Sequence, residues 1–151
     1  MSDTNVLDML NQPLTENDLE ASLFPDGAIV VFEVKKATLD QTPDEETGVP
    51  RNLMIFELAT ANEENTSKGT KFQVGYPFTY YISLNTTSKK GRDIEELVRR
   101  NLANFRKAAT GSVGPFGMPE QYVGRRLTAV MAIEVNERGR QNRIQKFVNP
   151  A

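Results

Sequence analysis

The sequence contains no cysteine and no histidine. Without cysteine, the chain can form no disulfide and offers no thiolate to a metal or a substrate. Without histidine, it lacks the commonest general base and the commonest protein metal ligand. Catalytic sites of the Ser-His-Asp and Cys-His types and zinc-thiolate sites are therefore excluded. We expect a protein that is not an enzyme, with no catalytic residues, no bound metal and no cofactor.

Long apolar runs are also missing. No stretch of about 18 apolar residues occurs, so the sequence predicts no membrane-spanning helix and no membrane partner. The first four residues provide neither the basic nor the apolar segment of a secretory signal. Matches to the glycosylation motif at Asn65 and Asn85 are then attributed to chance. At 151 residues, the chain suits one soluble, intracellular domain with a single core.

Charge is divided unequally along the chain. Residues 1–66 carry 14 acidic and 3 basic side chains, for a net charge of −11, whereas residues 67–151 carry 6 acidic and 15 basic, for +9. Such asymmetry is typical of a polyanion partner for the basic half, or of a protein partner for the acidic half. The alternative interpretation is that the two halves neutralise each other across the fold.

Residues 1–25 are acidic and carry few apolar side chains. Residues 6–10 are compatible with one helical turn, and Thr15 resembles the N-cap of a short helix over 16–23. We predict an acidic N-terminal arm over 1–25 and one domain over 26–151. The arm is a candidate site for a protein partner, or it occupies the basic surface until a ligand displaces it.

Alternating apolar and polar residues predict five strands. The most regular alternation runs from 72 to 84, where Pro77 cannot donate to a neighbouring strand and so indicates a bulge or a sheet edge. Residues 136–139 read as a hairpin turn. The predicted strands cover 28–38, 53–59, 72–84, 125–135 and 142–148.

One long helix is predicted between the third and fourth strands. Asp93 is its expected N-cap, Glu96 the partner in a capping box, and Gly111 the residue that ends it. An apolar stripe at helical spacing should face the core, and it consists of Ile94, Leu97, Val98, Leu102, Phe105 and Ala109.

Three strands, a helix and two strands is the order of the OB-fold, a five-stranded Greek-key barrel. We therefore predict a mainly β protein with one main helix, an OB-fold-like five-stranded barrel of order β-β-β-α-β-β, with the helix plugging one end. In that fold the second and third strands form the binding face, between the first and last interstrand loops. Those loops correspond here to 39–51 and 136–141.

Three segments support a resemblance to a known family. They are LVRRNL at 97–102, YVGRR at 122–126 and RIQKF at 143–147. With the layout that starts at Pro25, they resemble short phage and prophage single-stranded-DNA-binding-like proteins of replication and recombination modules. The resemblance implies an OB-type fold, non-catalytic binding of single-stranded DNA in phage replication or recombination, and a place in the bacterial host cytoplasm.

Binding of single-stranded nucleic acid requires cations along a groove and exposed rings on which bases stack. Tyr81 is the one aromatic residue on the polar face of the 72–84 strand, whereas Tyr76, Phe78 and Tyr80 share its apolar face. The alternative is that the cations form a solvated hairpin and that the rings lie in the core. The candidate nucleic-acid-binding residues are Tyr81, Lys89, Lys90, Arg125, Arg126, Arg138, Arg140, Arg143, Lys146 and Phe147.

Two other functions compete with this hypothesis. A capsid decoration or tail component of a phage particle would use the charge asymmetry to hold neighbouring copies together, as a homo-oligomer. A metal-dependent nuclease would use Asp26, Glu33 and Lys35 to hold Mg²⁺ and activate water. The acidic run at 44–46 more simply keeps its loop soluble.

Overall fold

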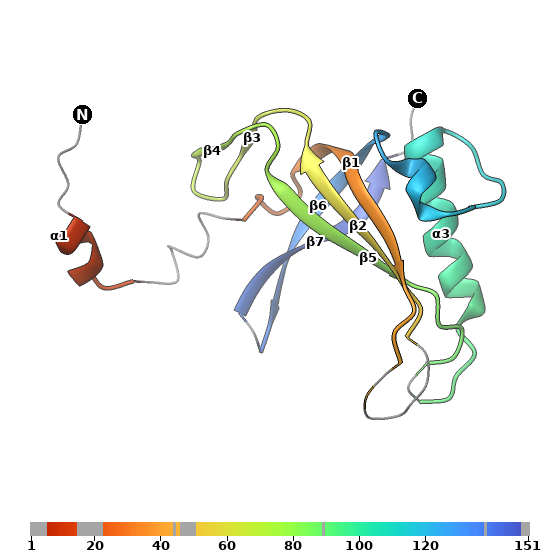
Figure 1. The fold of residues 1–151 in the computed structure, drawn as a ribbon. Coiled ribbons are helices and arrows are strands. Elements are labelled where there is room, and N and C mark those ends of the chain that lie inside the picture. The colour runs from red at the N-terminus through yellow and green to blue at the C-terminus, as the bar shows by residue number, and fades with distance from the viewer. Residues whose placement is uncertain are drawn as a thin grey trace.

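The computed structural model describes residues 6–14, 23–43, 45, 51–88, 90–137 and 139–148. Its main body is a five-stranded antiparallel sheet with strand order β5-β2-β1-β6-β7, and one long helix, α3 (Figure 1). The strands are β1 (Ile29–Asp40), β2 (Leu53–Thr60), β5 (Pro77–Ser83), β6 (Arg126–Asn136) and β7 (Gly139–Val148). The prediction of a mainly β protein with one main helix is confirmed.

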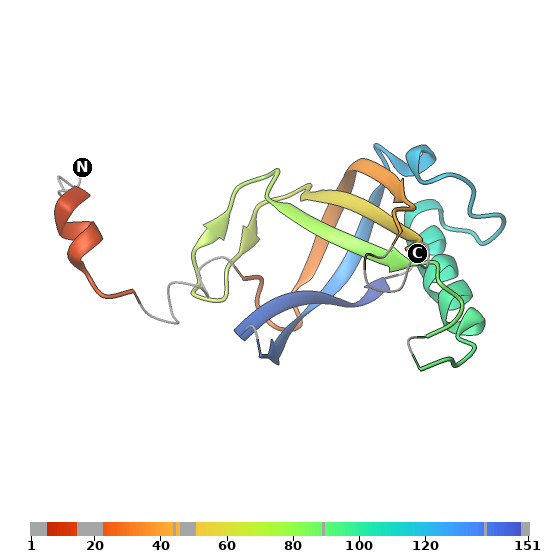
Figure 2. The same cartoon turned by 60° about the horizontal axis from the view of Figure 1, so that its bottom comes forward.

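The order of elements differs from the prediction in one insertion. A small hairpin lies between β2 and β5, and it consists of β3 (Glu64–Asn65) and β4 (Lys71–Phe72). The remaining elements are α1 (Val6–Asn11), α3 (Glu95–Thr110) and the 3₁₀ helix η1 (Pro119–Tyr122). The predicted closed barrel is also absent, because β5 and β7 each pair with only one neighbour among the described strands (Figure 2).

The predicted third strand, 72–84, is broken into two pieces. Gly75 adopts a positive φ of 91°, and the chain turns there before β5 begins at Pro77. The buried hydroxyl of Thr60 fixes this turn: it accepts a hydrogen bond from the Tyr76 amide at 3.0 Å and donates one to the Gln73 carbonyl at 3.1 Å. Pro77 is the first residue of an edge strand, where its missing N–H leaves no ladder bond unmade.

The core fills the concave side of the sheet. Val30, Phe32 and Val34 on β1 are fully buried, as their alternation predicted. Phe24, which the sequence placed in the arm, is also only 1% exposed, and its ring packs on Phe72 with centroids 4.9 Å apart. Its amide donates to Asn142 Oδ1 at 2.7 Å. The packed part of the chain therefore includes Phe24, ahead of the predicted domain boundary at residue 26.

Helix α3 packs against the sheet through Val98, Phe105 and Ala109, as predicted. Leu97 does not share that face, because 47% of its surface is exposed. The N-cap is Ile94 rather than Asp93, whose carboxylate instead accepts a hydrogen bond from the Glu95 amide at 3.0 Å. Gly111 ends the helix in a left-handed conformation, with its N–H bonded to the Lys107 carbonyl.

Two expectations about helices remain. The predicted turn at 6–10 is helical and forms part of α1. The predicted helix over 16–23 lies outside the described residues, except for Leu23, which is buried. Within the described part of the chain, no helix has the length and apolar character needed to span a membrane.

Candidate nucleic-acid interface

The two edges of the sheet come together at one pair of aromatic rings. Tyr80 on β5 meets Phe147 on β7 edge to face, with centroids 5.3 Å apart. Both rings also contact Phe105 of α3, at 5.9 Å from Tyr80 and 5.7 Å from Phe147. We call this junction of β5 and β7 the seam. Helix α3 lies beside it, at the end of the sheet opposite the β3–β4 hairpin (Figure 2).

The residues next to these two rings point away from the core. Neighbouring side chains in a strand project to opposite faces of the sheet. Tyr81 therefore projects outward beside Tyr80, and 56% of its surface is exposed. Lys146 projects outward beside Phe147 and makes no ion pair with any described residue. The seam thus has an exposed ring on one side and an exposed cation on the other.

The surface around Tyr81 is flat and carries little charge. Ile55 on β2 lies opposite Tyr81 in the register, and Thr79 and Ser83 share its face of β5. The nearest charges across the sheet are Glu57 and Lys36, whose side chains approach to 4.0 Å. A ring in such surroundings has both faces open to solvent and no role in the core.

Arg143 continues the basic side of the seam along β7. A register shift between Val130 and Met131 places Arg143 opposite Ala132, on the same outer face as Lys146. Its Nε lies 3.9 Å from a Glu134 carboxylate oxygen, and both side chains are about half exposed. Such an exposed pair is weak and can exchange for a phosphate contact. Arg140, nearer the hairpin, is exposed as well.

Arg126 is engaged at the start of β6. Its Nε lies 3.7 Å from a carboxylate oxygen of Glu33, which also binds the Lys35 ammonium at 2.5 Å. The hydrogen bond and charge of Lys35, with a smaller effect of Arg126, lower the pKa of Glu33. The neighbouring Arg125 is exposed and makes no ion pair with a described residue. This cluster is nearly neutral, unlike the basic side of the seam.

The other predicted residues occupy different places. Lys90 is exposed in the turn before α3, and Lys89 and Arg138 lie outside the described residues. Phe147 faces the core and supports the seam from inside, so its ring is only partly accessible. Tyr122, the ring before β6, is fully buried, and its hydroxyl donates to the Phe116 carbonyl at 2.7 Å.

Sequence analysis did not find two amides beside the seam. Asn101 and Asn104 of α3 line a depression of about 240 Å³, together with Tyr80, Ile144, Gln145, Lys146 and Phe147. Asparagine is a poor helix former, and two of them three residues apart inside a helix indicate a role beyond helix formation. Amides can donate to and accept from the edges of bases, so this depression adds hydrogen-bonding capacity to the seam.

The carboxylates considered for metal binding hold other partners. Asp26 accepts a hydrogen bond from the Ile133 amide at 2.9 Å, and Glu33 binds the two cations described above. In the described residues, no three acidic side chains converge as a metal site would require. In the acidic run 44–46, Glu45 is exposed, and the other two residues lie outside the described part.

No protein-family model matches the sequence, and no curated protein is significantly similar to it. The function is therefore inferred from the residues and their arrangement.

Proposed function

We propose that this protein binds single-stranded DNA, without catalysis, along the outer surface of the sheet across the seam. One observation supports this most directly. The contact between Tyr80 and Phe147 joins the two sheet edges, so that the exposed ring of Tyr81 and the cations of β7 flank one line on the surface. A stacking ring next to a row of cations is the arrangement that single-stranded nucleic acid requires.

The binding mechanism has two parts. Lys146 and Arg143 would contact successive phosphates and release condensed counterions, which makes the affinity depend on salt. Tyr81 would stack on a base, an interaction that is insensitive to sequence because every base has a π-face. A duplex offers the same phosphates but keeps its bases stacked inside. The ring therefore favours a single strand over a duplex.

The sheet topology supports an OB-like architecture as part of this proposal. The order β5-β2-β1-β6-β7 is that of a five-stranded Greek-key barrel opened between its third and fifth main strands. OB-folds are partly open barrels of this kind, and they use the second and third strands for binding. These strands correspond to β2 and β5, which carry Ile55 and Tyr81. A role in phage-type replication or recombination, in the bacterial cytoplasm, completes the proposal.

Fluorescence anisotropy of labelled oligonucleotides tests this function. The full chain should bind a single strand of mixed sequence more tightly than the matching duplex. The logarithm of the affinity should fall linearly with the logarithm of the salt concentration, by about 0.7 for each phosphate contacted on a single strand. Equal affinity for duplex and single strand would contradict a role for the ring. Absence of binding at low salt would contradict the proposal as a whole.

The structural component of a phage particle is a second candidate, and one observation favours it. Helix α1 exposes its apolar residues, as a segment that contacts a neighbouring subunit would. Such a protein should assemble with itself and ignore oligonucleotides. The anisotropy measurement therefore separates the two candidates.

A further inference from the structure

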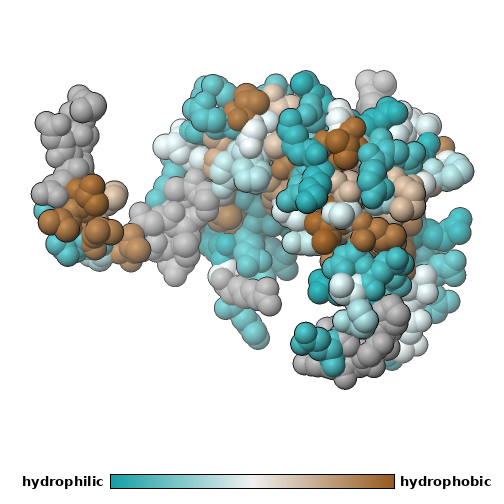
Figure 3. Space-filling model, in the orientation of Figure 1, coloured by the Kyte–Doolittle hydropathy of each residue, from teal (hydrophilic) through white to brown (hydrophobic). Residues whose placement is uncertain are grey.

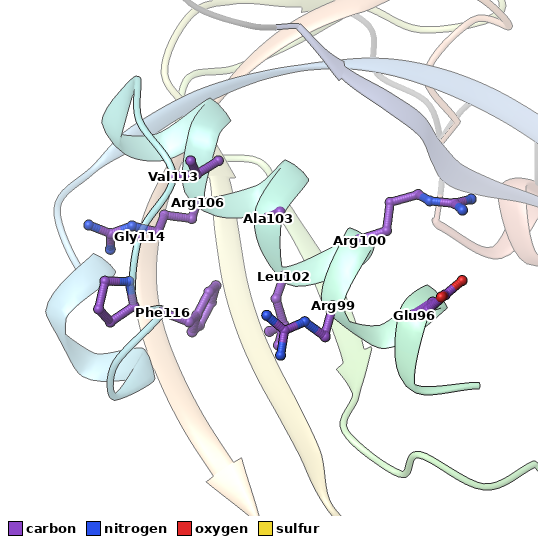
Figure 4. A pocket seen from close by; sticks show the side chains of 10 residues that line it. Glu96, Arg99, Arg100, Leu102, Ala103, Arg106, Val113, Gly114 and Phe116 are labelled. Atoms are coloured by element: carbon purple, nitrogen blue, oxygen red, sulfur yellow. The ribbon is translucent and has the colours of Figure 1, made fainter. Parts of the chain in front are cut away.

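A groove of about 820 Å³ runs between α3 and the loop that follows it (Figure 4). Its floor is apolar and consists of Leu102, Ala103, Val113, Pro115 and Phe116. Its rim carries Arg99, Arg100 and Arg106, with Glu96 as the one acidic residue among the lining side chains. Phosphates do not need an apolar floor. An apolar floor under a basic rim instead fits an amphipathic segment with acidic side chains.

The arginines of the rim have few acceptors. Arg99 and Arg100 are exposed and make no ion pair with any described residue. Arg106 donates from Nη1 to the Tyr122 hydroxyl at 3.1 Å, but its buried Nε has no hydrogen-bond partner in the described part of the chain. The rim therefore combines net positive charge with unused donor capacity.

Helix α1 has the complementary composition. None of its six residues is buried, and Met9 and Leu10 are 55% and 71% exposed. Figure 3 shows this apolar surface apart from the main body of the protein. Residues 1–26 carry six carboxylates, Asp8 of α1 among them, and no lysine or arginine. A helix of this length is not stable alone in water, so it requires a surface on which to pack.

We propose that α1 of one molecule docks in the α3 groove of a second copy. The apolar side chains of α1 would cover Leu102, Val113 and Phe116, and Asp8 would face the arginines of the rim. This is helix-in-groove recognition, in which apolar side chains give affinity and charge gives orientation. The inference is independent of the proposed nucleic-acid function, because it uses a different face of α3 from the seam.

The length of the arm favours a second copy over the same chain. Phe24 anchors the arm at the β3–β4 end of the sheet, whereas α3 lies at the opposite end (Figures 1 and 2). The 11 residues between α1 and Leu23 span at most about 36–40 Å when fully extended. A path around the sheet to the chain's own groove leaves little slack. Two copies can instead exchange arms reciprocally about a two-fold axis, which uses both grooves.

Sedimentation velocity of the full chain over a range of concentrations tests this inference. The parent should form a dimer that dissociates on dilution. Leu10→Asp in α1 and Arg99→Glu on the rim should each weaken the dimer by at least about tenfold, equivalent to 1.4 kcal/mol. Lys107→Glu is the matched control, because it makes the same charge change on an exposed residue of α3 outside the groove. It should leave the dimer unchanged.

A mixture of the two variants provides the sharpest arm of the test. The Leu10→Asp chain has an intact groove, and the Arg99→Glu chain has an intact α1, so together they can form one of the two contacts. The mixture should dimerise more strongly than either variant alone. A parent chain that stays monomeric at all concentrations would overturn the proposal. So would a dimer that neither substitution weakens.

Discussion

The rings of Tyr80 and Phe147 meet at 89° across the seam, between two strands that share no hydrogen-bond ladder in the described residues. The sheet edges are thus held by side chains rather than by backbone pairing. An edge-to-face pair of this kind contributes about 0.5–1.5 kcal/mol beyond the area that it buries. This contact fixes where the outward residues of the two edges lie relative to each other.

Replacing Phe147 by leucine should test the energetic role of this contact. Leucine keeps an apolar side chain but removes the edge-to-face geometry, so the free energy of unfolding should fall by about 0.5–1.5 kcal/mol. Urea denaturation followed by circular dichroism measures it. Tyr81→Leu is the control, because it changes an exposed ring one residue from Tyr80 and should cost less than about 0.5 kcal/mol. Equal losses in the two variants would mean that the seam contact has no special role.

Alkaline pH should loosen the seam through Tyr80. Burial raises the pKa of its hydroxyl above the ordinary value of 10.0, because the ionised form is poorly solvated there. The unfolded chain then loses this proton at lower pH than the folded chain. The stability that Tyr80 contributes is therefore complete below about pH 10 and is lost as pH rises through the folded pKa.

Melting temperatures of the parent and of Tyr80→Phe at pH 8 and pH 11 measure this effect. Other groups titrate in both proteins, so the informative quantity is the difference between them. The parent should lose more stability than Tyr80→Phe on going to high pH. Parallel losses would show that Tyr80 does not ionise differently in the folded state.

Two truncations should separate the arm from the core. Deleting residues 1–22 keeps Phe24, and we expect the remaining chain to fold and to bind oligonucleotides more tightly, because five carboxylates are lost. Deleting residues 1–24 removes Phe24, whose ring is fully buried against Phe72. Removing a buried Phe side chain typically costs about 3–5 kcal/mol. Equal stability of the two truncated proteins in urea would contradict the structural role of Phe24.

The basic side of the seam should set the salt dependence. Replacing Arg143 and Lys146 together by alanine should weaken binding equally for all sequences and reduce the salt slope by about 1.4, or about 0.7 for each lost phosphate contact. Arg126→Ala serves as the comparison, because Arg126 already faces Glu33 at 3.7 Å. It should change the slope less than either seam residue does alone. Anisotropy titrations at four salt concentrations give these slopes, and an unchanged slope in the double variant would exclude the β7 cations.

Local patterns predicted much of the fold. Alternation located β1, β2, β6 and β7 to within about three residues at each end, because each has one face in the core and one in solvent. The stripe at 94–109 and Gly111 located α3 in the same way. Tyr81 was assigned to the exposed face by the same alternation, and that assignment is confirmed.

Features that depend on distant contacts were not predicted. The break in 72–84 depends on Thr60, whose hydroxyl bonds to two backbone groups across the turn. Phe24 is a single apolar residue after an acidic segment, so no period marks it as core. The seam itself joins residues 67 positions apart, and only the curvature of the whole sheet brings Tyr80 to Phe147. Helical spacing alone also failed to show that Leu97 lies at the edge of its stripe.

The measurement that tests the central claim most directly is the affinity of Tyr81 variants for a single-stranded oligonucleotide. Base–aromatic stacking is worth about 1–3 kcal/mol per base by alanine substitution, so Tyr81→Ala should lose that amount and keep the salt slope of the parent. Tyr81→Phe should bind nearly as well as the parent, because the ring carries the contact. Binding by Tyr81→Ala that equals the parent's, in a variant that melts at the same temperature, would contradict the proposed interface.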